Sequence, residues 1–234
     1  MPNHVENIIT LKGDEKEIRE MLEVIKNDDF GLGTLDFNKI IPMPESLNIE
    51  SGSRTDRGLK AYRGFIEVYI FGRSATDALK ALEDIPVESE EIFLHQRTDI
   101  PRDEWELGKT AWNNIKNYGA PTWYEWSINN WGTKWNAFNQ NFEEPNVLWF
   151  DTAWEGVPLL IQTLSEIFPD VEFQYAYADE DLGSNVGKGT IRNGETDMTF
   201  PDNGSNEAFE IVFFVKPGLE EYLELTDEGY RWKA

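Results

Sequence analysis

Seven of the nine tryptophans lie between residues 112 and 154, and this density is the strongest chemical feature of the chain. Clustered indole rings stack against sugars or nucleobases, and they also pack well in protein cores. If residues 130–136 form a strand, Trp131 and Trp135 point to one face, and Lys134 and Asn136 point to the other. The candidate ligand-binding residues of this region are Trp131, Lys134, Trp135, Asn136 and Trp154.

Burial is the usual state of large aromatic side chains, so the core interpretation of these tryptophans is preferred. We predict that most of four rings are buried and hold the two halves of the chain together: Trp131, Trp135, Trp149 and Trp154. Lys134 is then a solvated residue beside them, and a cation in a ligand pocket is the alternative. Three or more of these rings around an open cleft would instead favour ligand binding.

Carboxylates form a second group of candidates. Asp179, Glu180 and Asp181 follow an aromatic, strand-like segment, and Asp151 lies on a neighbouring one. Such groups bind Mg²⁺ or Ca²⁺ through oxygen, or exchange protons with a substrate. Three consecutive residues cannot all face one site on a strand, and a chain with 44 acids produces such neighbours by chance. We keep Asp151, Asp179 and Glu180 as ligand-binding candidates and predict no catalytic residue, metal ligand or cofactor.

Two further patterns fall short of a functional motif. Residues 183–190 (GSNVGKGT) are similar to a phosphate-binding loop, but they have three residues where that loop needs four, and Gly189 follows the lysine. We therefore predict a glycine-rich hairpin. His4 and His95 are the only histidines; they are too far apart in sequence to suggest zinc or a hydrolytic triad, and His4 is expected to be structural.

The charge balance restricts the possible partners. The chain has 44 acidic and 21 basic residues, and its net charge of −23 repels phosphate backbones, so we expect no direct nucleic-acid binding. Residues 165–234 hold 16 acids and 5 bases, and we predict a contiguous negative face there. We expect a basic host protein as the partner, and mimicry of DNA is one way in which the chain would bind it. The alternative is that the negative charge only keeps the protein soluble. The partner-binding candidates are Glu220, Glu221, Glu224, Asp227 and Glu228.

The absence of cysteine excludes disulfides and thiolate metal sites and is compatible with a reducing cytoplasm. The first charged residue is Glu6, and the apolar run after it is too short for a secretory signal. No segment approaches the roughly 20 apolar residues of a membrane span. We expect a soluble protein in the cytoplasm of a bacterial host, without membrane contact.

The order of the expected helices and strands predicts an α+β fold. We expect an N-terminal α/β portion (residues 1–120) and a second portion (residues 121–234) that together form one compact unit. In the first portion we expect a β-like opening at 3–12, a helix after Asp14, an exposed loop at 45–60, a strand at 65–71, a helix at 75–82, a loop at 83–91 and a helix at 103–118 that stops at Gly119.

The second portion is predicted to contain an antiparallel sheet of at least four strands within residues 130–215. The helix near 158–168 should pack on one face of that sheet, because Leu160, Leu164 and Ile167 form an apolar stripe. The expected strands are 147–154, 171–177, 188–193 and 209–215, and residues 219–225 are expected to add one or two helical turns.

Five separated segments together resemble the YubB-type family of phage and plasmid proteins: residues 1–5 (MPNHV), 37–44 (FNKIIPMP), 130–136 (NWGTKWN), 150–154 (FDTAW) and 177–180 (YADE). The resemblance runs from residue 1 to about residue 180. It implies a ferredoxin-like sheet in the C-terminal half and carriage on a phage or plasmid. We expect the strand–helix elements of the N-terminal half to pack against that sheet. It supplies no catalytic residues, and the fold of residues 183–234 stays open.

Three functions from different classes follow. The preferred one is an uncharacterised accessory protein of a mobile genetic element that acts by protein–protein interaction through its acidic surface, as an anti-defence protein or DNA mimic. The second is a small-ligand or carbohydrate-binding module that uses the tryptophan-rich region. The third is a carboxylate-dependent hydrolase that uses Asp151, Asp179 or Glu180.

Overall fold

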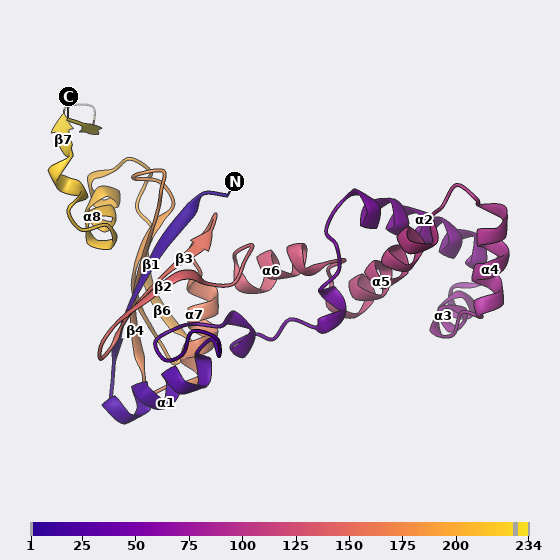
Figure 1. Cartoon of the computed structure of the whole chain (residues 1–234), viewed down its shortest axis with the longest axis horizontal. Coiled ribbons are helices and arrows are strands. Elements are labelled where there is room, and N and C mark those ends of the chain that lie inside the picture. The colour runs from indigo at the N-terminus through magenta and orange to yellow at the C-terminus, as the bar shows by residue number, and fades with distance from the viewer. Residues whose placement is uncertain (1, 227–228, 234) are drawn as a thin grey trace. The chain divides into compact units, whose positions relative to one another are not determined.

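The computed structural model describes residues 2–226 and 229–233, and its elements are labelled in Figure 1. The chain forms two compact units. A sheet unit contains Met1–Pro42 and Ser127–Ala234, and a helical unit contains Met43–Trp126. The opening strand therefore belongs with the C-terminal half of the chain.

Six strands form one antiparallel sheet in the sheet unit, in the order β2-β3-β1-β4-β5-β6. Five of them lie within residues 130–215, which confirms the predicted antiparallel sheet of at least four strands. The first strand of the chain lies at the centre, between β3 and β4. The strands are β1 (His4–Lys12), β2 (Phe138–Glu143), β3 (Val147–Ala153), β4 (Glu172–Asp179), β5 (Val186–Arg192) and β6 (Glu195–Thr199).

Helices cover both faces of this sheet, as Figure 1 shows. The predicted helix α7 (Pro158–Ile167) lies on one face, where Tyr175 of β4 accepts a hydrogen bond from the Val157 N–H at the start of the helix. On the other face, Ala176 and Ala178 of β4 pack against α8 (Asn206–Val215). Alternation of side chains along β4 separates these two layers. The first helix, α1 (Glu15–Ile25), lies on the α7 side and is capped by Asp14, as predicted.

Helix α8 corrects the strand predicted at residues 209–215. A short apolar run fits a buried strand and a buried helix equally well, so the periodicity of this segment was ambiguous. Ser205 decides for the helix because its side chain accepts a hydrogen bond from the Ala208 N–H at the first turn. The helix then buries Phe209, Ile211 and Val212.

The helical unit corrects three further predictions. The strand expected at 65–71 is the end of a long helix, the loop at 45–60 holds the start of that helix, and the acidic loop at 83–91 is largely helical. The reason is that Tyr62, Phe65 and Ile66 share one helix face and pack around the buried Trp105. The helix ending at Gly119, which has φ of 75°, is confirmed. The helices are α2 (Ser53–Ile70), α3 (Ala75–Glu83), α4 (Val87–Gln96) and α5 (Arg102–Tyr118).

The C-terminal segment forms one short turn, η3 (Leu219–Glu221), followed by a two-stranded sheet of β7 (Leu223–Thr226) and β8 (Gly229–Trp232). Only the first part of the predicted helical tail is therefore helical. Tyr230 fixes the hairpin to α8, because its ring lies 4.6 Å from Phe209 and 5.2 Å from Phe213. Within the described part of the chain, no helix is both long and apolar enough to cross a membrane.

Candidate functional site

The tryptophan-rich segment is a helix and a turn instead of the strand considered for residues 130–136. Helix α6 (Trp123–Trp131) ends there, and Gly132 has φ of 79°. Trp131 is 4% exposed, and its indole N–H donates to the Ile41 carbonyl at 2.9 Å. Asn136 donates to Asp36 and accepts from the Phe37 N–H. Both side chains therefore hold the segment before residue 42 in place.

Trp135 and Trp154 instead lie at the surface, with exposed fractions of 38% and 36%. The ammonium of Lys134 lies 4.8 Å from the ring centroid of Trp135 and 5.0 Å from that of Trp154. Trp149 is half-buried, so Trp131 alone of the four tryptophans is buried, and the predicted burial of most of them is wrong. We call Trp135, Trp154 and the space that Lys134 occupies between them the indole notch.

The backbone of Trp154 is in the left-handed region, with φ of 76°. This conformation costs a residue other than glycine roughly 1–2 kcal/mol. Two hydrogen bonds hold it: the Trp154 N–H donates to the Asn3 carbonyl at 2.9 Å, and the Trp154 carbonyl accepts from the Asn185 amide at 2.7 Å. The indole of Trp154 is therefore directed by a clamped and unfavourable backbone conformation.

Asp179 organises the loop beside the indole notch. Its carboxylate accepts from the side-chain amides of Asn3 and Asn185, at 3.1 and 2.8 Å, and from the Asp181 N–H at 2.9 Å. The neighbouring Glu180 is exposed, and its N–H donates to the His4 carbonyl. Asp179 is buried and both of its oxygens are engaged, so it positions Trp154 through Asn185.

Asp151 does not join this group, although the sequence suggested that it could. Asp179 pairs with Val5 of β1 and Asp151 pairs with Glu6, and consecutive residues of a strand point to opposite faces. Asp151 instead accepts a hydrogen bond from the Asn139 amide at 2.8 Å and lies 3.8 Å from a ring nitrogen of His4. Burial raises the pKa of the Asp151 carboxyl above its ordinary value.

Three asparagines were missed by the sequence reasoning: Asn3, Asn139 and Asn185. Two of them, Asn139 and Asn185, have φ of 48° and 46°. Asparagine is enriched in this region of the backbone map, so an Asn in a turn is a usable signal for such positions. His4 was assigned only a structural role, and the structure places it beside Asp151 at the exposed end of β1.

The predicted partner-binding acids lie in the C-terminal hairpin region. Glu220 and Glu221 belong to η3, where a Glu220 oxygen accepts from the Gly218 N–H, and Glu224 lies exposed on β7. Asp227 and Glu228 lie outside the described residues. Among the described residues, no carboxylate between 165 and 226 forms an ion pair with a lysine or arginine of the same range.

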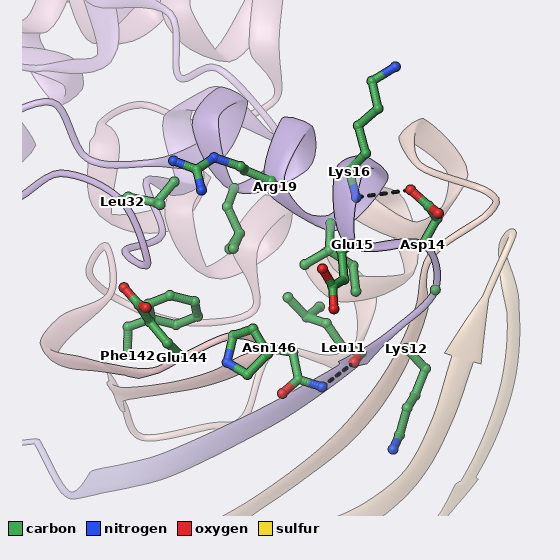
Figure 2. Close-up of a pocket in the computed structure, with 14 residues that line it drawn as sticks. Leu11, Lys12, Asp14, Glu15, Lys16, Arg19, Leu32, Phe142, Glu144 and Asn146 are labelled. Carbon is green, nitrogen blue, oxygen red and sulfur yellow. Dashed lines mark hydrogen bonds between the residues drawn. The ribbon is translucent and has the colours of Figure 1, made fainter.

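A groove of about 770 Å³ lies at the other end of β1, and Figure 2 shows the side chains around it. Its floor is apolar, with Leu11, Leu22 and Phe142, while its rim carries both signs of charge. Arg19 and Glu144 are examples of the two signs on that rim. The described residues contain no cluster of three or more side chains suited to hold a metal ion.

Comparison with known proteins finds one domain model that matches part of the C-terminal half. No curated protein matches the chain. A crystal structure of the protein api92 from Yersinia pseudotuberculosis, described with the family model DUF1281, matches with 11% identity and a TM-score of 0.42. That match covers 88% of this chain and 100% of the other. Residues 130–217 match the model of the ferredoxin-like domain in Api92-like protein, which confirms the ferredoxin-like fold expected for this half.

Proposed function

We propose that the chain is an accessory protein of a mobile genetic element that acts by binding a basic protein through the acidic surface of its sheet unit. The observation that carries this proposal is the uneven charge of the two units. The sheet unit has 29 acidic and 11 basic residues, a net charge of −18. The helical unit has 15 acidic and 10 basic residues, a net charge of −5.

The pairing of side chains supports this proposal. In residues 165–226, Lys216 pairs with Glu6 of β1, and the Lys188 ammonium lies 3.6 Å from the ring centroid of Phe214. These bases therefore neutralise no carboxylate of residues 165–226. An unpaired carboxylate at the surface extends its field into solvent for about a Debye length, roughly 8 Å at physiological salt. Such a field accelerates the approach of a basic protein and repels phosphate backbones.

The test compares two variants of the full chain with matched numbers of neutralised carboxylates. A basic protein captured from host lysate at low salt is purified, and its association rate is measured with each variant at low and high salt. In the first variant, amides replace four acids of the sheet unit; in the control, they replace four exposed acids of the helical unit. The first set is Glu195, Asp197, Glu207 and Glu210, and the control set is Glu67, Glu83, Asp84 and Glu88.

We expect the sheet-unit variant to lose about tenfold in association rate at low salt, because charge acts mainly on encounter. The control variant should change by less than about twofold. Equal losses in both variants, or an association rate that does not depend on salt, would refute the proposal. If DNA and this chain compete for the captured protein, the acidic surface acts as a DNA mimic. If the captured protein binds DNA and this chain at the same time, mimicry is excluded.

A second candidate function is the binding of a small ligand or carbohydrate. The exposure of Trp135 and Trp154 favours it, since exposed indoles form stacking platforms. Titration of the full chain with a panel of neutral oligosaccharides, followed by tryptophan fluorescence, tests it. A saturable change that Trp135→Leu removes would support a sugar site, and an unchanged spectrum across the panel would exclude one.

A further inference from the structure

The indole notch already holds a cation. Lys134 lies within 6 Å of two ring centroids, which is the range in which the electron-rich face of an indole attracts a positive charge. Tryptophan is the strongest of the aromatic side chains in this interaction. Because both rings are more than one-third exposed, a side chain of another protein can reach them without moving the fold.

The backbone of Trp154 is held independently of the cation in the indole notch. Asn3 and Asn185 hold the Trp154 backbone from either side, and Asp179 accepts hydrogen bonds from both of these amides. None of these four hydrogen bonds involves Lys134, so the backbone that carries the ring does not depend on Lys134. Such preorganisation is what a binding site needs in order to lose little conformational freedom when a ligand enters.

The surrounding charges favour a cation over an anion. Lys134 is the single basic residue of residues 127–164, which contain four acids. Glu155 follows Trp154 directly, and it is close enough to Asp179 that burial and this second carboxylate together raise its pKa. An incoming anion would meet these carboxylates, whereas an incoming cation would be attracted by them and repelled by Lys134.

We propose that Trp135 and Trp154 form a cation-binding notch that Lys134 fills in the free protein, and that a cationic side chain of the basic partner fills in the complex. The occupant is an arginine, a lysine or a methylated lysine of that partner. This inference rests on the proposed function, because it identifies where on the sheet unit the basic partner is anchored. Lys134 acts as an intramolecular competitor that the partner must displace.

The test uses tetramethylammonium as a probe for the notch alone, at constant ionic strength. The indole N–H signals of the isotope-labelled full chain are followed by NMR in four proteins: the unsubstituted chain, Lys134→Met, Lys134→Met with Trp135→Leu, and the control Lys188→Met. The control removes another lysine that lies over an aromatic ring, that of Phe214. The indole spectrum of each variant also reports whether the fold is retained.

We expect Lys134→Met to bind the probe at least fivefold more tightly than the unsubstituted chain, with shifts at Trp135 and Trp154. Adding Trp135→Leu should remove this gain, and Lys188→Met should leave both signals unchanged. Equal or weaker probe binding by Lys134→Met would overturn the inference, as would an equal effect of a neutral sugar on the same signals.

The partner gives a separate result. If the captured basic protein binds Lys134→Met and Trp135→Leu as it binds the unsubstituted chain, the notch is not its anchor and the inference fails. The proposed function would survive that result, because it depends on the neutralised carboxylates of the sheet unit. Conversely, an association rate of the captured protein that does not depend on salt would refute the proposed function, whatever tetramethylammonium does at the indole notch.

Discussion

Helices α2 and α5 cross at a pair of glycines, and substitution of Gly58 by alanine is the sharpest test of the helical unit. A Cβ atom at Gly58 would lie 1.8 Å from the backbone oxygen of Glu104, and one at Gly108 would lie 2.0 Å from the carbonyl carbon of Gly58. Ordinary contacts of this kind are at 3.4–4 Å, so the helices must separate by roughly 1.5–2 Å.

The separation would loosen the contacts of Trp105 with the α2 face. Overpacking costs about 1–3 kcal/mol, and the better helix propensity of alanine returns roughly 1 kcal/mol. A backbone oxygen cannot move aside like a flexible side chain, so the cost should lie at the upper end. We expect Gly58→Ala to reduce the stability of the helical unit by roughly 1–2 kcal/mol.

Gly64 on the same helix provides the control, because a Cβ atom there meets nothing within 4 Å. Gly64→Ala should be stabilising by roughly 0.5–1 kcal/mol. Native-state hydrogen exchange of the full chain in low urea, read in peptides from α2 and α5, measures both variants in the unit concerned. Equal protection in Gly58→Ala and Gly64→Ala would refute the close crossing at Gly58.

Three further predictions concern buried groups. Lys109→Met should destabilise the helical unit by about 3 kcal/mol in urea unfolding, because Glu90 is 6% exposed and both of its oxygens accept from the Lys109 ammonium, at 2.7 and 2.9 Å. Gly156→Ala should lower the melting temperature of the sheet unit, since its Cβ would lie 2.5 Å from the Tyr177 ring and cost about 1–3 kcal/mol. Asp151→Asn should become more stable relative to the unsubstituted chain as pH rises above about 4. The reason is that the pKa of the Asp151 carboxyl is raised in the folded state, so its ionisation opposes folding. A stability difference that shrinks with rising pH would contradict this prediction.

The regular elements with local signals could be predicted from the sequence. Asp14 caps a helix whose face of Ile18, Met21 and Ile25 is buried as the spacing requires. Strand β4 follows from aromatic alternation, and Pro158 begins α7. These signals act within one turn or one strand, so a local reading suffices for them.

The elements with ambiguous periods could not be assigned in this way. Residues 65–71 and 209–215 are apolar and aromatic on most sides, and both are helical because of what they pack against. In the first case the partner is Trp105, and in the second it is the small face of β4 with Ala176 and Ala178. Tertiary contacts therefore decide between helix and strand where the local pattern does not.

The candidate site shows the same limit in its chemistry. Residue types pointed to tryptophans, a lysine and carboxylates, and the structure brings Lys134, Trp135 and Trp154 together. The separation of Asp151 from Asp179 follows from their pairing with consecutive residues of β1, which point to opposite faces of the sheet. That register is a property of the whole sheet, so residue types alone could not supply it.

Trp154 connects these observations. Its left-handed backbone is fixed by Asn3 and Asn185, which lie 151 and 31 residues away along the chain. Glycine would adopt this conformation without strain, so the indole is present at a cost of roughly 1–2 kcal/mol. Strain of this kind persists where the surroundings over-determine it, and it concentrates at binding sites. The ring of Trp154 is partly exposed and lies 5.0 Å from the Lys134 ammonium, and a role for the ring in binding a cation gives its position a physical reason.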